Sequence, residues 1–155
     1  MRYAEYPLIE EVPIRRLSGS EYALLAWLSV RIVVVLAVLP VALRCLTVAR
    51  LVRLLTPRRM GATRRPALLW RSAGAVDRLV DRRPFRFWGH CLRRSLLLYF
   101  VATRAGYSVQ VVVGARRDGS GVTGHAWIEL DGRPLLEPGE HPEQSFIVME
   151  RLPRQ

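Results

Sequence analysis

The spacing of apolar residues changes once along the chain, close to Gly106, and this change limits the folds that the chain can adopt. Before this glycine, apolar side chains recur every three or four residues, as in amphipathic helices. After it, apolar and polar residues alternate between Asp-Gly pairs, as in strands joined by hairpins. Helices followed by an antiparallel sheet predict the α+β class.

The expected helices are 18–55, 67–82 and 91–105, and the expected strands lie within 107–117, 123–130, 134–138 and 145–152. Ser18 or Ser20 can cap the first helix, and Pro40 should bend or break it. Gly106 suits the end of the third helix. The Asp-Gly pair at 131–132 should join two neighbouring strands in a hairpin.

The length and composition fit one globular domain with at most a small appendage. The chain has 155 residues, half of them hydrophobic, which is enough apolar material for a core. Its formal net charge is +11, and all 24 basic residues are arginines. This balance favours acidic partners such as an acidic peptide or an anionic lipid surface. Few aromatic residues interleave the arginines of 44–104, so nucleic acid is not expected as a partner.

Residues 22–43 come nearest to a membrane span. They include thirteen Leu, Ile or Val residues and are long enough to cross a bilayer. Arg31 near the centre and Pro40 in the last turn oppose insertion, so a span is allowed but not compelled. The preferred interpretation is a helix buried in the core or docked on a partner. A true span and an association with the membrane surface are the alternatives.

The protein is expected in the cytoplasm, with residues 22–55 as the part that would contact a membrane. Three glutamates lie among the first eleven residues, where a secretory signal would be basic. Two cysteines, Cys45 and Cys91, do not make a disulfide framework and fit a reducing compartment. If residues 22–43 do span a membrane, the arginine-rich part after them should stay on the cytoplasmic side.

Cys91 lies where the third helix should begin, in the stretch FWGHCLRRSLLLYF. At a helix N-terminus, the unpaired backbone N–H groups and the helix dipole stabilise an anion, so a thiolate is favoured there. Arg93 and Arg94 add positive charge, which should lower the pKa of the thiol further. Cys91 is therefore the candidate nucleophile, and a cysteine that only packs is the alternative.

His125, in GHAWIEL, is the candidate base. On a strand it shares one face with Trp127 and Glu129, while the residues between them form an apolar face. The apolar face should cover the core, which leaves His125 and Trp127 directed at something else, such as the helix that carries Cys91. A histidine hydrogen-bonded on the sheet surface is the alternative. His90 should point away from Cys91 around the helix.

A third group should orient the imidazole and fix its tautomer. Glu137 follows the strand after His125 by one hairpin, so it can return beside the ring. Asp131 competes for this role, but Asp-Gly there is better explained as a turn. Glu129 is a second competitor and could pair with an arginine instead. The order Cys91, His125 and an acid fits a cysteine hydrolase or an acyl transferase.

Other chemistries find no support in the residue spacing. No pair of Cys and His residues has the CxxC or HxxxH spacing of a metal site, so neither a metal nor another cofactor is expected. The glycines of VVVGARRDGSGVTG are not followed by GK[ST] or by a helical pattern. A phosphate-binding loop is therefore not expected either.

Residues 85–138 are similar to a known family. C-L-x-R-S-L, the G-x-R-R-D-G turn and H-A-W-x-E-x-D-G-x-P together resemble the transglutaminase-like cysteine proteases of lasso-peptide biosynthesis, the leader peptidases. The arginine-rich helical half before them agrees with that family in general character. The resemblance implies a transglutaminase- or papain-like core, in which a helix that carries the cysteine packs on an antiparallel sheet.

By this resemblance, Cys91 is the nucleophile, His125 the base and Glu137 the third member of a triad. The family usually has aspartate at the acid position, so Glu137 is a departure. The residues expected to bind substrate lie beside the triad: Trp88, Arg94 and Trp127.

The resemblance further implies a cysteine endopeptidase that cuts a ribosomally made precursor between leader and core peptide. A separate, ATP-using, asparagine-synthetase-like cyclase would then close the freed core into a macrolactam. A small recognition protein usually presents the leader, and we expect it to be a separate chain because residues 1–84 look helical and apolar. Residues 1–84 are thus predicted to dock on a partner or a membrane, and 85–155 to form the catalytic core.

Two other functions remain open from the sequence. A transglutaminase, an amidase or another acyl transferase would use the same three residues, and only the resemblance favours the peptidase. The second alternative is a non-catalytic, basic adaptor associated with a membrane. It would tolerate the loss of Cys91 and His125 but not of the arginines within 44–104.

Overall fold

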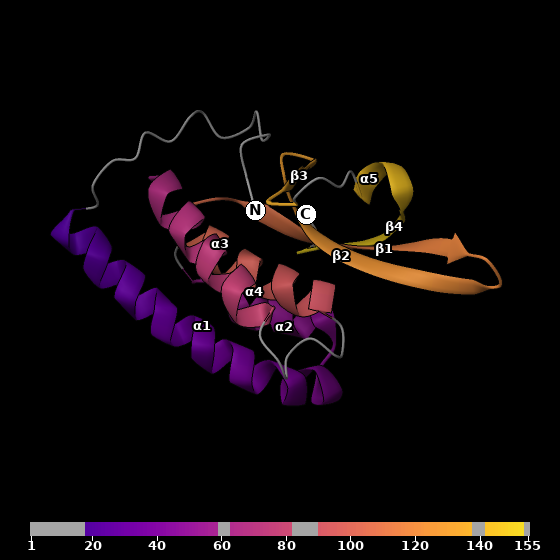
Figure 1. Ribbon diagram of the computed structural model, residues 1–155, viewed down its shortest axis with the longest axis horizontal. Coiled ribbons are helices and arrows are strands. Elements are labelled where there is room, and N and C mark those ends of the chain that lie inside the picture. Colours follow the sequence, from indigo (N-terminus) through magenta and orange to yellow (C-terminus); the bar gives the residue numbers. More distant parts are fainter. Residues whose placement is uncertain (1–17, 59–62, 82–89, 138–141, 154–155) are drawn as a thin grey trace.

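The computed structural model describes residues 18–58, 63–81, 90–137 and 142–153. Its main helices are α1 (Gly19–Cys45), α2 (Val48–Leu55), α3 (Pro66–Val80) and α4 (His90–Arg104). They precede a sheet in the sequence, so the predicted α+β class is confirmed. Figure 1 shows α1 along the outside of the helical layer, with α4 between the helices and the sheet.

α1 begins with a capping box. The Ser18 side chain accepts a hydrogen bond from the backbone N–H of Glu21, whose carboxylate accepts one of 2.8 Å from the Ser18 N–H. Ser18 is thus confirmed as the cap. Pro40 lies inside the helix, so of the two predicted outcomes the break at Pro40 is wrong. The helix continues to Cys45 with Leu46 as its C-cap, and Thr47 caps α2. One missing backbone donor did not end a helix that is packed along its length.

α1 has one buried and one exposed apolar face. Its buried side chains follow helical spacing: Leu28, Ile32, Leu36 and Leu39. By length and composition alone, Glu21–Cys45 could cross a membrane, since its apolar window has a mean hydropathy of 2.5 and only 22% of that window is buried. A core helix passes the same test. The inner face of α1 belongs to the core, and its outer face is open.

The sheet has four antiparallel strands in the order β3-β2-β1-β4. Their bounds are β1 Val109–Asp118, β2 Gly121–Leu130, β3 Arg133–Leu135 and β4 Ile147–Leu152. Asp131 and Gly132 have φ values of 52° and 77°, so the predicted hairpin is confirmed with the positive φ angles that its short turn needs. A single turn, α5 (Pro142–Ser145), was not predicted, because four residues carry no period.

One face of the sheet shares a hydrophobic core with the helices. Ile128 and Leu130 of β2 belong to the same buried cluster as the leucines of α4 and the inner face of α1. This confirms the predicted apolar face of β2. The boundary predicted at residue 84 lies outside the described residues, and the division into 1–84 and 85–155 stays a prediction. Side chains from both sides of it meet in this core.

Candidate active site

Cys91 is the second residue of α4 and is partly buried. Ser95, one turn later, joins this end of the helix to β2. Its hydroxyl lies 2.8 Å from the carbonyl oxygen of Cys91 and 2.7 Å from that of Ala126, the neighbour of His125. In the sequence Ser95 appears only as part of the motif C-L-x-R-S-L, and no local pattern predicts this contact. Ser95 thereby fixes the thiol relative to the strand that carries the histidine.

The side chains of Cys91 and His125 form a hydrogen bond. This bond is the main cause of a lowered pKa at Cys91, with a backbone hydrogen bond from Ala126 adding to it, while burial acts in the opposite direction. The same bond, followed by the interaction with Glu137, raises the pKa of His125 to about 9. Both shifts favour a thiolate beside an imidazolium. The predicted direction for the thiol is confirmed, but its cause is the histidine and not the neighbouring arginines.

Glu137 faces the other ring nitrogen of His125. Its Oε2 lies 3.6 Å from His125 Nε2, and the Glu137 side chain is 6% exposed. Within the described residues this nitrogen is buried and has no hydrogen bond, so the Glu137 carboxylate is its charged neighbour. The structure therefore brings Cys91, His125 and Glu137 together in the predicted order. Their catalytic roles stay a prediction.

The two competing acids lie elsewhere. Asp131 forms the hairpin turn, as expected. Glu129 is almost fully buried and accepts hydrogen bonds from the indole of Trp127 at 3.0 Å and from Arg151 at 3.1 Å. The predicted pairing of Glu129 with an arginine is thus confirmed. His90 lies 3.2 Å from Asp81, so it points away from the thiol.

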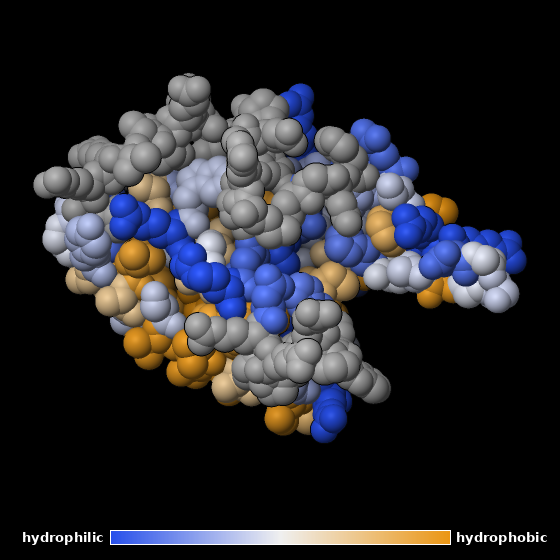
Figure 2. Space-filling model, viewed as in Figure 1, coloured by the Kyte–Doolittle hydropathy of each residue, from blue (hydrophilic) through white to orange (hydrophobic). Residues whose placement is uncertain are grey.

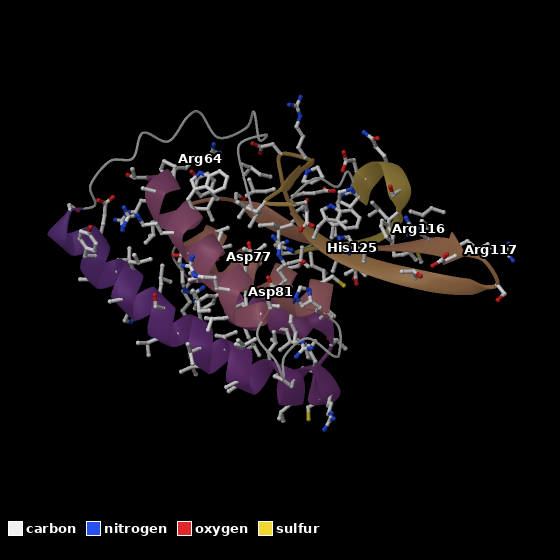
Figure 3. The ribbon with its side chains drawn as sticks, in the orientation of Figure 1. Arg64, Asp77, Asp81, Arg116, Arg117 and His125 are labelled. Carbon is white, nitrogen blue, oxygen red and sulfur yellow. The ribbon has the colours of Figure 1, made fainter. Side chains whose placement is uncertain are left out.

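Arg94 joins α4, α3 and the segment after β3. Its guanidinium donates hydrogen bonds of 2.9 Å to Asp77, 2.6 Å to Glu137 and 2.6 Å to the Leu136 carbonyl oxygen. Burial opposes the charge of Arg94, but the carboxylates of Glu137 and Asp77 outweigh burial and raise its pKa. Figure 3 shows Asp77 on α3, with His125 beyond it on β2.

The predicted substrate contact of Arg94 is therefore corrected to a structural one. Its side chain is 12% exposed and its donors already point at protein oxygens. Leu136 has a φ of 62°, which leucine rarely adopts, and the hydrogen bond from Arg94 holds its carbonyl there. The turn at Leu136 brings Glu137 back towards His125. Sequence reasoning missed Asp77, since no local pattern links it to a residue on another helix.

Trp127 is fully buried, so the predicted substrate contact is corrected here as well. Its ring stacks with His125 at 5.9 Å between centroids, and Phe146 stacks on His125 at 5.2 Å. The segment around Phe146 covers Trp127 on this face of β2, whereas His125 also reaches Cys91 of α4, as predicted. Arg116 lies over the Phe146 ring at 4.8 Å. Phe146 was expected only as a strand residue, and Trp88, the third predicted substrate contact, lies outside the described residues.

Gly114 on β1 leaves room for this stack. A Cβ there would lie 2.9 Å from the Trp127 ring and 3.0 Å from the Cβ of Phe146. We expect Gly114→Ala to lower the free energy of unfolding by about 1–3 kcal/mol and to displace the rings that hold His125. Gly124→Ala is the matched control, because its Cβ would meet its nearest neighbour at an ordinary 3.8 Å. Urea unfolding of both variants measures the difference, and equal stabilities would contradict the packing argument.

The described residues contain no group of three or more His, Cys, Asp and Glu side chains that could hold a metal ion. What they do contain is a thiol activated by an imidazole, with a buried carboxylate behind the ring. Such an arrangement can attack a carbonyl carbon, pass a proton to the leaving group and form a covalent thioester.

A family model supports this chemistry independently. The model of the transglutaminase-like superfamily matches residues 32–151, well over half of the chain, and it includes Cys91, His125 and Glu137. No curated protein and no solved structure is significantly similar to the chain. At the family level the match supports a hydrolase or acyltransferase of the cysteine-protease type. The chain therefore belongs to the transglutaminase-like superfamily.

Proposed function

We propose that the protein is a cysteine endopeptidase that removes the leader peptide from a ribosomally made lasso-peptide precursor. The observation that carries the proposal is the hydrogen-bonded pair of Cys91 and His125, whose pKa values are shifted towards a thiolate and an imidazolium. The motifs around Cys91 and His125, which resemble those of leader peptidases, support the choice of substrate.

In this mechanism the Cys91 thiolate attacks the scissile carbonyl carbon and forms a tetrahedral intermediate. The backbone N–H of Cys91, near the start of α4, is a donor to the oxyanion. His125 then protonates the nitrogen of the first core residue, the scissile C–N bond breaks, and the core leaves as a free amine while the leader remains bound to Cys91 as a thioester. Neutral His125 next takes a proton from water, which hydrolyses the thioester and regenerates the thiolate. Glu137 stabilises the imidazolium through its carboxylate.

The proposal includes the partners that the resemblance implies. A separate leader-recognition protein presents the precursor, and an asparagine-synthetase-like cyclase closes the freed core with ATP. Nucleic acid has no part in it. The cytoplasm is the proposed location of the catalytic site and of these partners.

The pH dependence of cleavage follows from the raised pKa of His125. The imidazolium protonates the leaving amine, so cleavage should be lost as the pH rises through about 9, where His125 gives up its proton. At low pH the rate should fall as Cys91 becomes protonated. Initial rates of precursor cleavage across the pH range measure both limbs. A rate that stays constant through pH 9 would contradict the assignment of His125 as the acid.

The experiment that tests the proposal combines the purified protein, its recognition partner and the precursor peptide encoded beside it, with products followed by mass spectrometry. We expect one cut, and Cys91→Ala should abolish it. Cys45→Ala is the matched control, because Cys45 is exposed on α1, outside the group around His125, and its loss should leave the rate unchanged.

Each alternative function gives a different product. An acyl transferase or amidase would return a peptide of unchanged length and shifted mass. A non-catalytic adaptor would retain its biological activity in Cys91→Ala and His125→Ala variants. No cleavage by a soluble wild type with its recognition partner would contradict the peptidase proposal.

A further inference from the structure

The outer face of α1 is an exposed apolar surface in the part of the chain that the structure describes. Its large apolar side chains are 43–66% exposed: Tyr22, Trp27, Val30, Val33, Val34, Val38 and Val41. We call these seven residues the outer face. Figure 2 shows hydrophobic surface gathered along α1, on the lower left of the molecule. Between Tyr22 and Val41 the only charged residue is Arg31, so this surface is nearly free of charge.

Positive charge collects where α1 ends. Arg44, Arg50, Arg53 and Arg58 are all exposed around the junction of α1 and α2. The exposed Leu54 lies among them. Residues 18–58 contain one acid, Glu21, and it is held in the capping box at the opposite end of α1. The surface of this segment is therefore apolar along α1 and purely basic at the junction of α1 and α2.

The packing of α1 sets its orientation. Leu28, Ile32, Leu36 and Leu39 are at most 3% exposed and lie in the core that α1 shares with α3 and α4. A helix that crossed the bilayer would leave these contacts and expose the leucines of α3 and α4. With the packing kept, α1 can only lie parallel to a surface and present its outer face to it.

The chemistry of the outer face suits lipid better than protein. Five of its seven residues are valines, a residue type that seldom carries the binding energy of protein interfaces. Acyl chains can contact a smooth row of valines, because they need no pocket to hold an anchoring side chain. Tyr22 and Trp27 are of the type that gathers at membrane interfaces. Arg31 lies over the Trp27 ring at 4.2 Å, with a side chain long enough to reach lipid headgroups.

We propose that α1 docks in the plane of a membrane surface that contains anionic lipids. The outer face would enter the boundary between headgroups and acyl chains, and the arginines at the junction of α1 and α2 would bind lipid phosphates. The candidate active site lies between α4 and the sheet, away from the outer face, so it would stay open to the aqueous side (Figure 1). This proposal does not depend on the chemistry proposed for Cys91.

Flotation of the full chain with vesicles tests this docking. We expect binding to vesicles of phosphatidylcholine mixed with phosphatidylglycerol and little binding to phosphatidylcholine alone. The double variant Val30→Asp, Val34→Asp should bind at least about tenfold more weakly. The pair Arg50→Gln, Arg53→Gln should reduce binding roughly tenfold. The control pair Val122→Asp, Met149→Asp changes apolar residues of the sheet that are even more exposed, and it should bind like the wild type.

Four results would overturn the proposal. Equal binding to neutral and anionic vesicles would contradict the role of the arginines. No binding by a soluble monomer would contradict the docking itself. Resistance to alkaline carbonate extraction would indicate a span. Dimers that dissociate in the Val30→Asp, Val34→Asp variant would show that a second copy covers the outer face. Circular dichroism of each variant verifies that the helices remain folded.

Discussion

Replacing Arg94 by methionine is expected to lower the free energy of unfolding by about 3–5 kcal/mol. Methionine keeps much of the apolar stem but removes the charge between the buried carboxylate of Glu137 and the partly buried carboxylate of Asp77. Asp77 and Glu137 would then lie partly or fully buried without their cation, and within the described residues Oδ2 of Asp77 has no hydrogen bond even with Arg94 present. Burial raises the pKa of Asp77 even with Arg94 present, so this carboxylate has little other support.

The control for this change is Arg78→Met, an exposed arginine on α3 one residue after Asp77. Its effect should stay within about 0.5 kcal/mol, as for ordinary surface substitutions. Adding Asp77→Asn and Glu137→Gln to Arg94→Met removes the uncompensated charges and should recover part of the lost stability. Urea unfolding measures all three proteins. Equal stability of the Arg94 and Arg78 variants would contradict the account of Arg94 as a buried ion-pair centre.

Replacing His125 by alanine is expected to reduce precursor cleavage by on the order of 10³- to 10⁴-fold. The change removes the proton donor to the leaving amine and the main cause of the lowered pKa of Cys91. Both losses act on the same step, so the His125→Ala variant should resemble Cys91→Ala. Combining the two changes should not reduce the cleavage rate further. Single-turnover cleavage of the precursor measures the chemical step directly.

His90→Ala is the matched control for His125. His90 immediately precedes Cys91 in the chain, but its ring pairs with the exposed Asp81 and not with the thiol. Its replacement should leave the cleavage rate within a few fold of the wild type. A His90 variant as inactive as the His125 variant would show that the wrong histidine has been assigned as the base.

The order of the elements and the three central residues could be predicted because residue types and spacing within each segment indicate them. A period of three to four residues marks α1, α3 and α4, and Asp-Gly marks the turn between β2 and β3. Cysteine and histidine are rare in this chain, and Glu137 follows the hairpin after His125, so the topology brings Cys91, His125 and Glu137 together. The helix break was misplaced because Pro40 is tolerated inside a packed helix, whereas Thr47 starts a new one.

The surroundings of the site could not be predicted because their contacts join residues that are far apart in the sequence. Arg94 pairs with Asp77 and Glu137, which are 17 and 43 positions away in the sequence. No local sequence pattern indicates that these three side chains lie together. Trp127 was expected to contact substrate because the alternation along its strand places it opposite the apolar core face. Phe146, from a segment 19 residues later, covers it. For these reasons Arg94 and Trp127, which were predicted to contact substrate, make structural contacts within the protein instead.

The measurement that tests the central claim most directly is the pH dependence of cysteine alkylation in the unmodified chain. Iodoacetamide labels both cysteines, and peptide mass spectrometry separates Cys91 from the exposed Cys45, which serves as an internal reference. We predict that at mildly acidic pH Cys91 reacts at least about tenfold faster than Cys45, and that His125→Ala removes the difference. Equal rates for the two cysteines at every pH, in the wild type and in the variant, would contradict the claim that His125 holds Cys91 as a thiolate.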